Sequence, residues 1–299
     1  MQRRTFLKTL GAGLALGGPA GRLAVGETAA VPDLVAVRNG EPDALFDRGI
    51  EALGGIGRFV KKGQTVVVKP NIGWNVPPER AANTHPRLVR RIIEHCLQAG
   101  AREVSVFDHT ADAWRSCYRT SGIEQAVRDA GGRMAPGNQE RYFQTVAIPA
   151  GRRLRETREH ELILQSDVLI NVPVLKSHGG ARLTIAMKNL MGVVWDRGYW
   201  HLNDLHQCIA DFATYRQPDL TVVDAYNVML RHGPRGVSEA DVVNMRVQLL
   251  AVDQVAADAA AARLFGLEDS AEVGYIGIAH EMGAGRMDLE NLRIQRIAL

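Results

Sequence analysis

The sequence predicts an α/β protein with a mostly parallel sheet and helices on both faces. Short runs of β-branched residues, such as 65–68, have the composition of buried strands. These runs alternate with helical segments nearly throughout the chain, which is typical of parallel or mixed sheets. No long Pro/Ser linker divides the 299 residues, so we expect one core, either undivided or in two lobes.

The first thirty residues have the pattern of a twin-arginine signal peptide. The sequence RRTFLK at 3–8 precedes a glycine-diluted apolar stretch at 10–16 and small-residue cleavage options at 24–26 and 28–30. We therefore expect export through the twin-arginine translocase to the periplasm, with 31–299 as a single α/β domain. This route carries folded proteins and so favours a bound cofactor. No later run reaches 18 apolar residues, so we expect no stable membrane insertion.

The net charge and the cysteine spacing bear on which classes of function are expected. Residues 1–26 carry four of the 36 basic residues and none of the 33 acidic ones, so the rest of the chain has a formal net charge of about −1 instead of +3. The high isoelectric point therefore gives no argument for nucleic-acid binding. The three cysteines at 96, 117 and 208 match no zinc or iron–sulfur spacing, and a disulfide that involves Cys117 stays open.

The first half of the chain is built from strand–turn–helix units. Turn chemistry ends the first strand at Lys69-Pro70, and Thr84 caps the first helix, which ends at Gly100. In order, the predicted elements are strand 65–68, helix 84–99, strand 104–107, helix 121–130, weaker strand 142–148, helix 157–165 and buried strand 167–174.

The second half continues the alternation after a long loop. The predicted elements are helix 202–215, strand 220–224, a tight loop at 231–236, strand 247–252, an alanine-rich helix to about 265 and a short helix at 274–282.

Chemically active side chains follow the predicted strands. Strand by strand, they are Lys69 and Asn71, Asp108 and His109, Lys176 and His178, Asp224, and Asp253. The carboxyl ends of parallel strands share one edge of a sheet, so these residues converge if the sheet is parallel. A single aspartate at a strand end is more often a helix cap or a turn residue, so the prediction depends on convergence.

The segment 171–192, NVPVLKSHGGARLTIAMKNLMG, carries the strongest site signal. It brings Lys176, His178, Arg182 and Lys188 within thirteen residues, around a Gly-Gly pair that lets backbone approach a ligand. Lys188 has apolar neighbours, so burial would lower the pKa of its amine and suit it to act as a base or as a point of covalent attachment. The alternative is a lysine whose stem covers the core while its ammonium reaches water.

Three sets of candidate residues follow from these patterns. The predicted catalytic residues are His178, Lys188 and His85. The predicted substrate-binding residues are Lys69, Asn71, Lys176, Arg182 and Asn189, because cations and amides suit a carboxylate or phosphate. The predicted metal ligands are His206, Asp108 and Asp224. Asp211 lies five residues after His206, about 140° around a helix, so the two do not share a face.

Several motifs in a fixed order resemble a known family. They are KPNIG at 69–73, NTHP at 83–86, the 171–192 block, the helix from His206 to Asp211, PDLTVVDA at 218–225 and HGPRG at 232–236. The chain resembles the family called domain of unknown function 362 over nearly all of its length after the signal segment. Many members of that family carry ferredoxin-type iron–sulfur segments, whereas this sequence has no such motif. The resemblance implies a fold without implying a reaction.

The same block is also similar to the nickel-pincer lactate racemase family. That family has a histidine, then glycines, then a cofactor-holding lysine ten residues on, and His178 and Lys188 reproduce this spacing. The similarity implies that Lys188 holds a nickel-pincer-like cofactor and that His85 or His178 is a proton-transfer base.

The sequence supports three hypotheses. The first is an exported enzyme that acts on a small anionic substrate, with a metal or organometallic cofactor as an option. The second is a periplasmic protein that binds an anion or a metal, or serves a redox partner, without turnover. The third is a scaffold without a site, which predicts that the strand ends do not converge.

Overall fold

The computed structural model describes residues 31–299, so the predicted signal peptide at 1–30 lies outside the described residues. The core is a ten-stranded sheet, in which β12-β1-β11-β10-β7-β2-β3-β4 is the strand order and β8 and β9 extend from β10. The strands of this sheet are β1 Leu34–Arg38, β2 Thr65–Pro70, β3 Glu103–Val106, β4 Arg133–Met134, β7 Val168–Val172, β8 Val174–His178, β9 Arg182–Thr184, β10 Leu220–Met229, β11 Val242–Ala251 and β12 Ile294–Ala298. A separate hairpin pairs β5 Phe143–Ala147 with β6 Glu156–His160.

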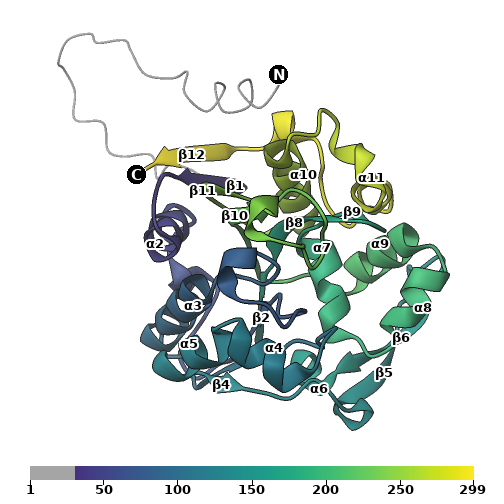
Figure 1. Cartoon of the computed structure of the whole chain (residues 1–299), viewed down its shortest axis with the longest axis horizontal. Helices are drawn as coiled ribbons and strands as arrows, with labels where there is room; N and C mark the ends of the chain where they lie inside the picture. The colour runs from purple at the N-terminus through teal and green to yellow at the C-terminus, as the bar shows by residue number, and fades with distance from the viewer. Residues whose placement is uncertain (1–30) are drawn as a thin grey trace.

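Helices connect most of the strands and cover both faces of the sheet (Figure 1). Their bounds are α2 Pro42–Ala52, α3 Pro86–Gln98, α4 Trp114–Thr120, α5 Ile123–Asp129, α6 Glu161–Gln165, α7 Ala186–Asn189, α8 Arg197–Leu202, α9 Leu205–Tyr215, α10 Gln254–Phe265 and α11 Gly274–Glu281. In Figure 1, α2, α3 and α5 lie on one side of the sheet, and α7, α9, α10 and α11 lie on the other.

The strand β2 contributes side chains to two hydrophobic clusters, one on each face of the sheet. Its side chains alternate, so that Val66 and Val68 pack into the cluster with α2, α3 and α5, while Val67 packs into the cluster with α7, α9 and α10. All three valines are buried. A central strand of a parallel sheet is covered on both faces, which explains its continuous apolar run.

The predicted fold class is confirmed. The strands β2, β3, β4, β7 and β10 run parallel to their neighbours along the ladder from β10 to β4, and β1 pairs with β12 in parallel. The sheet is continuous from β12 to β4.

One predicted strand end does not join the others. The strand β11 runs antiparallel to both β1 and β10, because a short connection after β10 returns the chain beside it. Asp253 follows β11 and therefore lies at the opposite edge of the sheet from the ends of β2 and β3. Its carboxylate accepts hydrogen bonds from Val255 N at 2.8 Å and Ala256 N at 3.1 Å, which makes it the N-cap of α10.

Two further element predictions were wrong in type. The predicted helix at 157–165 is strand β6 followed by the short helix α6. The predicted loop after residue 174 is an antiparallel hairpin of β8 and β9, which the tight turn at Gly179-Gly180 allows. No helix within residues 31–299 is long and apolar enough to cross a membrane.

Candidate functional site

A cavity of about 430 Å³ lies at the carboxyl ends of β2, β3 and β8. Four cationic side chains line it, together with histidines and amides: Lys69, Lys176, Lys188, Arg197, His109, His178, His201, Asn71 and Asn189. Among the described residues that line it, Asp108 is the one carboxylate. Its volume is within the range of small-molecule sites, and basic side chains outnumber acidic ones in its lining.

The ends of β2 and β3 are joined by a buried ion pair. Lys69 Nζ lies 2.9 Å from Asp108 Oδ1, and the two side chains are 1% and 3% exposed. The ammonium also donates to Pro70 O at 2.8 Å and to Asn189 Oδ1 at 3.0 Å. Burial lowers the pKa of Lys69 and the charge of Asp108 opposes that shift. Two oxygens thus accept hydrogen bonds from this ammonium, and a carboxylate oxygen lies beside it at ion-pair distance.

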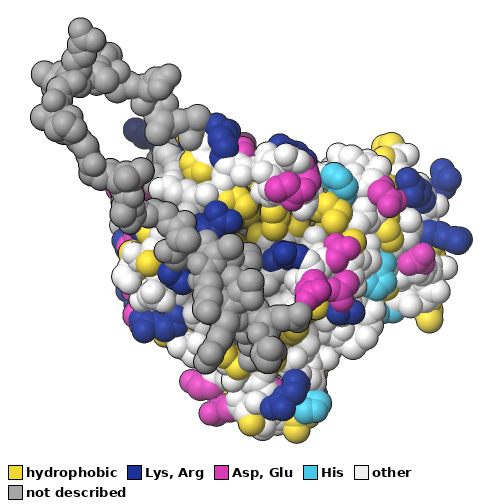
Figure 2. All heavy atoms as spheres, turned by 90° about the horizontal axis from the view of Figure 1, so that it is seen from above, with side chains coloured by type: hydrophobic (Ala, Val, Ile, Leu, Met, Phe, Trp, Pro, Cys, Tyr) yellow, Lys and Arg dark blue, Asp and Glu magenta, His cyan; other side chains and the backbone are white. Residues whose placement is uncertain are grey.

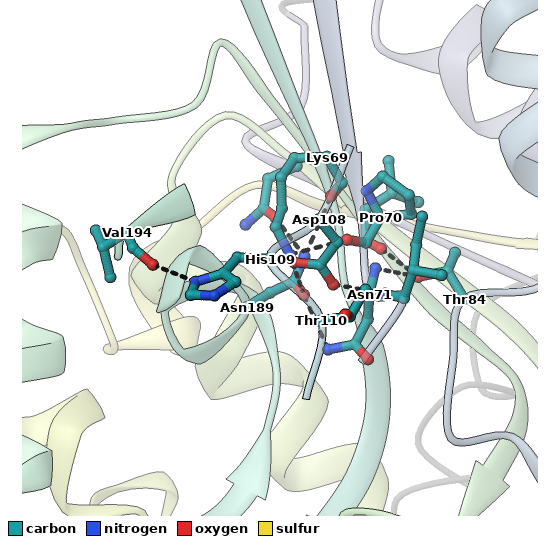
Figure 3. Close-up of polar contacts among 12 residues, drawn as sticks. Lys69, Pro70, Asn71, Thr84, Asp108, His109, Thr110, Asn189 and Val194 are labelled. Atoms are coloured by element: carbon teal, nitrogen blue, oxygen red, sulfur yellow. Dashed lines mark hydrogen bonds and ion pairs between the residues drawn. The ribbon is translucent and has the colours of Figure 1, made fainter. Parts of the chain in front are cut away.

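Amide side chains extend this contact across the sheet. Asn189, from α7, accepts from Asn71 Nδ2 at 3.0 Å and donates to Asn171 Oδ1 at 2.8 Å. Figure 3 shows Lys69, Asp108, Asn71 and Asn189 pointing toward one another, whereas His109 points away toward Val194. The predicted ligand-binding residues Lys69, Asn71 and Asn189 therefore bind one another and fix the floor of the cavity.

Gly192 makes this arrangement possible. A Cβ at this position would overlap Asp108 Oδ1 and stand 2.6 Å from Lys69 Nζ. The backbone of the 3₁₀ turn at Leu190–Val193 can therefore pass over the ion pair only without a side chain. The carbonyl of Gly192 also accepts a hydrogen bond from His109 N at 2.9 Å.

Lys176 enters the cavity from strand β8. Its side chain is 1% exposed, and its ammonium donates to Ala82 O and, at 3.2 Å, to Asn71 Oδ1. Burial lowers its pKa well below the ordinary value, and the charge of Lys188 adds to the effect. One hydrogen of the protonated amine remains for a ligand.

Lys188 is the least engaged of the three lysines. Its polar contact is with Met191 Sδ at 2.9 Å, and a thioether is a weak acceptor. No carboxylate among residues 31–299 lies within ion-pair distance of the Lys188 amine. Burial lowers the pKa of Lys188 to about 7, and the charges of Arg197 and Lys69 contribute. The prediction that this amine is buried and has a depressed pKa agrees with the structure.

The turn that carries Lys188 is held by a buried carboxylate from another helix. Asp258, in α10, accepts hydrogen bonds from Ala186 N at 2.6 Å and Met187 N at 3.1 Å. Burial raises the pKa of Asp258 to about 8, against these two donors. Sequence patterns gave no signal for this contact, because Asp258 lies within an alanine-rich helix 70 residues after Lys188.

Arg197 is a further cation that sequence reasoning missed. Its guanidinium donates to His109 O at 2.6 Å and to Thr110 O at 2.8 Å. Burial lowers its pKa, which is the direction expected of a cation with little counter-charge nearby. These two contacts use two of its five donors, so the others remain for a ligand.

His178 lies in the cavity, but its contacts argue against a role as base. Its Nδ1 accepts hydrogen bonds from Gly180 N and Ala181 N, both at 3.0 Å. These contacts assign the proton of the neutral ring to Nε2. Burial, followed by the charges of Lys188 and Lys176, lowers the pKa of His178 to about 3. The ring therefore presents an N–H donor over the ordinary pH range. His201 stacks on it with ring centroids 6.4 Å apart.

His85 and Asp224 lie together outside the lining of the cavity. Asp224 accepts from His85 N at 2.7 Å and from Tyr226 N at 3.1 Å, which ties the start of α3 to β10. The Nδ1 of His85 accepts from Arg87 N at 3.2 Å and caps α3. The prediction that His85 is catalytic is not supported by this placement.

Arg182 and His206 line a different cavity, of about 740 Å³. Arg182 pairs with Glu272 at 2.5 Å, and its side chain is half exposed. The Nδ1 of His206 accepts from Tyr275 N at 3.1 Å. The structure therefore places Arg182 and His206 outside the cavity that Lys176 and Asp108 line.

The predicted metal set does not form a centre. Asp108 binds Lys69, Asp224 binds two backbone N–H groups, and His206 binds a third. Within residues 31–299, no group of three or more His, Cys, Asp and Glu side chains is arranged to hold a metal ion. Asp211 accepts from Arg153 N and Leu154 N and is structural. The three cysteines are buried and free, so no disulfide forms between them.

Another cavity, of about 610 Å³, lies against β1, β11 and β12. Its lining is mostly apolar, with Leu249, Leu264, Met287 and Ile294 among its members. None of the predicted site residues that the structure describes contributes to it. Seven of the eleven predicted site residues line the cavity of about 430 Å³, which we call the cationic cavity.

Two proteins provide comparisons with this chain. It is 28% identical over 201 residues to the thylakoid-associated protein sll1697 of Synechocystis sp., and the match covers 62% of this chain and 59% of that protein. The lactate racemase apoprotein from Thermoanaerobacterium thermosaccharolyticum has a TM-score of 0.40 and 12% identity, over 71% of this chain and 53% of that one. A structural similarity at this level carries no argument about chemistry.

The profile of one family spans the elements that build the cavity. It matches residues 66–263, from β2 through α10, and is described as a domain of unknown function (DUF362). The matched region contains the cationic residues Lys69, Lys176, Lys188 and Arg197. The chain therefore belongs to the domain of unknown function 362 family.

Proposed function

We propose that this protein is an exported enzyme that acts on a small anionic substrate in the cationic cavity. The observation that carries the proposal is an imbalance of side chains: four basic side chains line a cavity of about 430 Å³ beside one carboxylate, Asp108, among the described residues. The carboxylate is neutralised by Lys69 at 2.9 Å. Like charges buried together are stabilised by an anion, which supplies the missing counter-charge.

The arrangement of free donors supports binding by three of the four cations. Lys69 has three oxygen partners, whereas Lys188 has a thioether, Lys176 has one hydrogen to spare and Arg197 retains three donors. Charge-assisted hydrogen bonds from these groups suit a carboxylate or a phosphate. On the face that Figure 2 shows, basic and acidic side chains are interspersed, in contrast with the lining of the cavity.

Lys188 supports catalysis rather than binding alone. Burial lowers its pKa to about 7, so a large fraction of the amine is unprotonated at neutral pH. An unprotonated amine can take a proton from a bound substrate or attack an electrophilic carbon. The neutral His178 can donate a hydrogen bond from Nε2 to an oxygen where negative charge develops.

The cofactor alternative uses the same amine. A group attached covalently to Lys188 would fit, because this amine lies in the cavity and its bonding to Met191 is weak. When bound, such a group would supply an electron sink or an organometallic centre. The chain would then contribute Arg197 and Lys176 to orient the anionic substrate. Export through the twin-arginine translocase remains part of the proposal, and it rests on residues 3–8 and the stretch that follows.

The second candidate function is capture of an anion without turnover, as a periplasmic binding or redox accessory protein. Two observations favour it. Asp108 is paired with Lys69, and the Nδ1 of His178 is occupied by two N–H groups, so neither is free to act as a base. Turnover by this protein would therefore depend on another group of the cavity, such as Lys188.

Calorimetric titration of residues 31–299 with small carboxylates and phosphates tests the proposal. Wild type should bind at least one of these anions, and R197Q should weaken binding by about tenfold to a hundredfold, since a hydrogen bond to a charged group contributes about 1.5–3 kcal/mol. R182Q is the matched control, because Arg182 pairs with Glu272 outside this cavity. Equal losses in R182Q and R197Q would contradict the assignment. Conversion of the bound anion, followed by NMR, distinguishes the enzyme from the accessory protein.

A further inference from the structure

The use of lysine in this chain is selective. Of the 36 basic residues, 30 are arginine and six are lysine. Three of the six, Lys69, Lys176 and Lys188, line the cationic cavity, and each is buried. Arginine binds carboxylates at least as well as lysine, but it stays protonated and is not a nucleophile. A cavity built on lysine in an arginine-rich chain therefore points to chemistry at an amine.

The hydrogen bonds distinguish the three amines. Lys69 is held by Asp108, Pro70 O and Asn189. Lys176 donates to Ala82 O and Asn71, so a covalent bond at its nitrogen would leave a buried carbonyl without a donor. Lys188 contacts a sulfur, which loses little when the amine is converted. The geometry selects Lys188.

We propose that Lys188 forms a Schiff base with the carbonyl carbon of a small oxo-carboxylate, such as a 2-oxo acid. The proposal rests on the proposed function, since it takes the anion site of the cavity as the binding site for the carboxylate. The amine of Lys188 adds to the carbonyl carbon to give a carbinolamine. Loss of water then forms the C=N bond, and the carbonyl oxygen leaves with the two hydrogens of the amine.

The rest of the cavity suits this substrate class. Arg197 and the remaining hydrogen of Lys176 can bind the carboxylate, and the Nε2–H of His178 can polarise the carbonyl oxygen. A neutral histidine that donates in this way is an established means of activating a carbonyl. An unprotonated amine is needed for the attack, and burial of Lys188 provides one near neutral pH.

Reductive trapping tests the inference on purified residues 31–299 at neutral pH. The intact mass is measured first, to establish that Lys188 is unmodified. Pyruvate, glyoxylate and 2-oxoglutarate are then each added with sodium cyanoborohydride, which delivers hydride to a C=N bond. The expected product has gained the mass of the acid less one oxygen atom, and peptide mapping should place it on Lys188.

The chain supplies its own controls. Lys61 and Lys62 are exposed, so they report the background of unspecific modification. Lactate has the carboxylate without the carbonyl, and acetone has the carbonyl without the carboxylate, and neither should give an adduct at Lys188. K188R should lose the adduct while it keeps a cation in the cavity. The mapping on wild type stands even if K188R fails to fold.

The outcomes separate this inference from the proposed function. Anions that bind in calorimetry without a Lys188 adduct would overturn the Schiff base and leave the anion site intact. Adducts on Lys61 and Lys62 at the same rate as on Lys188 would overturn it as well, and so would a covalent group already present on Lys188 in protein exported by its own signal. If no small anion binds at all, the proposed function fails, and this inference fails with it.

Discussion

The ion pair between Lys69 and Asp108 should be the most costly contact of the cavity to break. The two side chains are 1% and 3% exposed and lie 2.9 Å apart. In D108N, the amide oxygen can still accept from Ile72 N, as Asp108 Oδ2 does at 2.6 Å, but the negative charge is lost. Lys69 then retains Pro70 O and Asn189 without a counter-charge.

The expected loss of stability in D108N follows from the buried charge that remains on Lys69. Removing one partner of a buried ion pair costs about 3–5 kcal/mol, because the other charge remains buried. The matched control is D43N, since Asp43 pairs with Arg87 on the surface with 42% and 49% of the side chains exposed. An exposed pair of this kind contributes about 0–1 kcal/mol.

Urea unfolding of residues 31–299, followed by circular dichroism, measures both changes. We expect the free energy of unfolding to fall by about 3–5 kcal/mol in D108N and by less than about 1 kcal/mol in D43N. The double variant K69M/D108N should cost less than the sum of the single variants, because it removes both buried charges. A cost below about 1 kcal/mol for D108N, or strict additivity in the double variant, would show that Lys69 and Asp108 do not form a coupled, buried ion pair.

Three further predictions concern the same region. G192A should destabilise the protein by about 1–3 kcal/mol or more in urea unfolding, because its Cβ would overlap Asp108 and crowd Lys69. G198A is its control, since a Cβ there meets no atom within 4 Å. Asp258 has a pKa raised from 3.8 to about 8, so between these pH values this group binds more protons in the folded state than in the unfolded state, and its own contribution to stability falls as pH rises. The difference in stability between wild type and D258N should therefore shrink as pH rises from about 4 to about 8, and a difference that stays constant with pH would contradict the assignment. Anion affinity in calorimetry should fall as pH rises through about 7, as Lys188 loses its proton, and K188M should lack this dependence.

Much of the site could be predicted from the order of strands along the chain. The ends of β2, β3 and β8 carry Lys69, Asp108 and Lys176, and a parallel sheet brings strand ends to one edge. The burial of Lys188 could also be predicted, because its apolar neighbours are local in sequence. Both inferences depend on periodicity and on adjacent residues, which a single sequence records directly.

Contacts between distant segments could not be predicted in this way. The direction of β11 depends on which strands it joins, so the sequence did not reveal that Asp253 lies at the opposite edge. The contacts of Lys69 require an aspartate that follows β3 and an amide from α7, which only the folded chain brings together. Arg197 begins α8 in a stretch without a motif, and its role depends on the carbonyls that it meets.

The scarcity of lysine in the composition also indicates the site. Lysine is scarce in this chain, and half of the lysines lie at the carboxyl ends of predicted strands or in the 171–192 block. A residue type that is rare overall but concentrated at the predicted site indicates that its chemistry is needed there. Because the chain has 30 arginines and six lysines, the concentration of lysine at the predicted site can be recognised from the sequence alone.

The most direct test of the central claim is the titration of Lys188 itself. Residues 31–299 contain five lysines, so NMR of protein labelled with ¹³C at the lysine side chain can follow each one as pH changes. We expect Lys188 to titrate near 7, well below 10.5, and we expect a small anion that binds in the cavity to raise this pKa. Exposed Lys61 and Lys62 serve as internal references. If Lys188 titrates near 10.5 and its pKa does not change when anions are added, Lys188 is not the buried amine of an anion site.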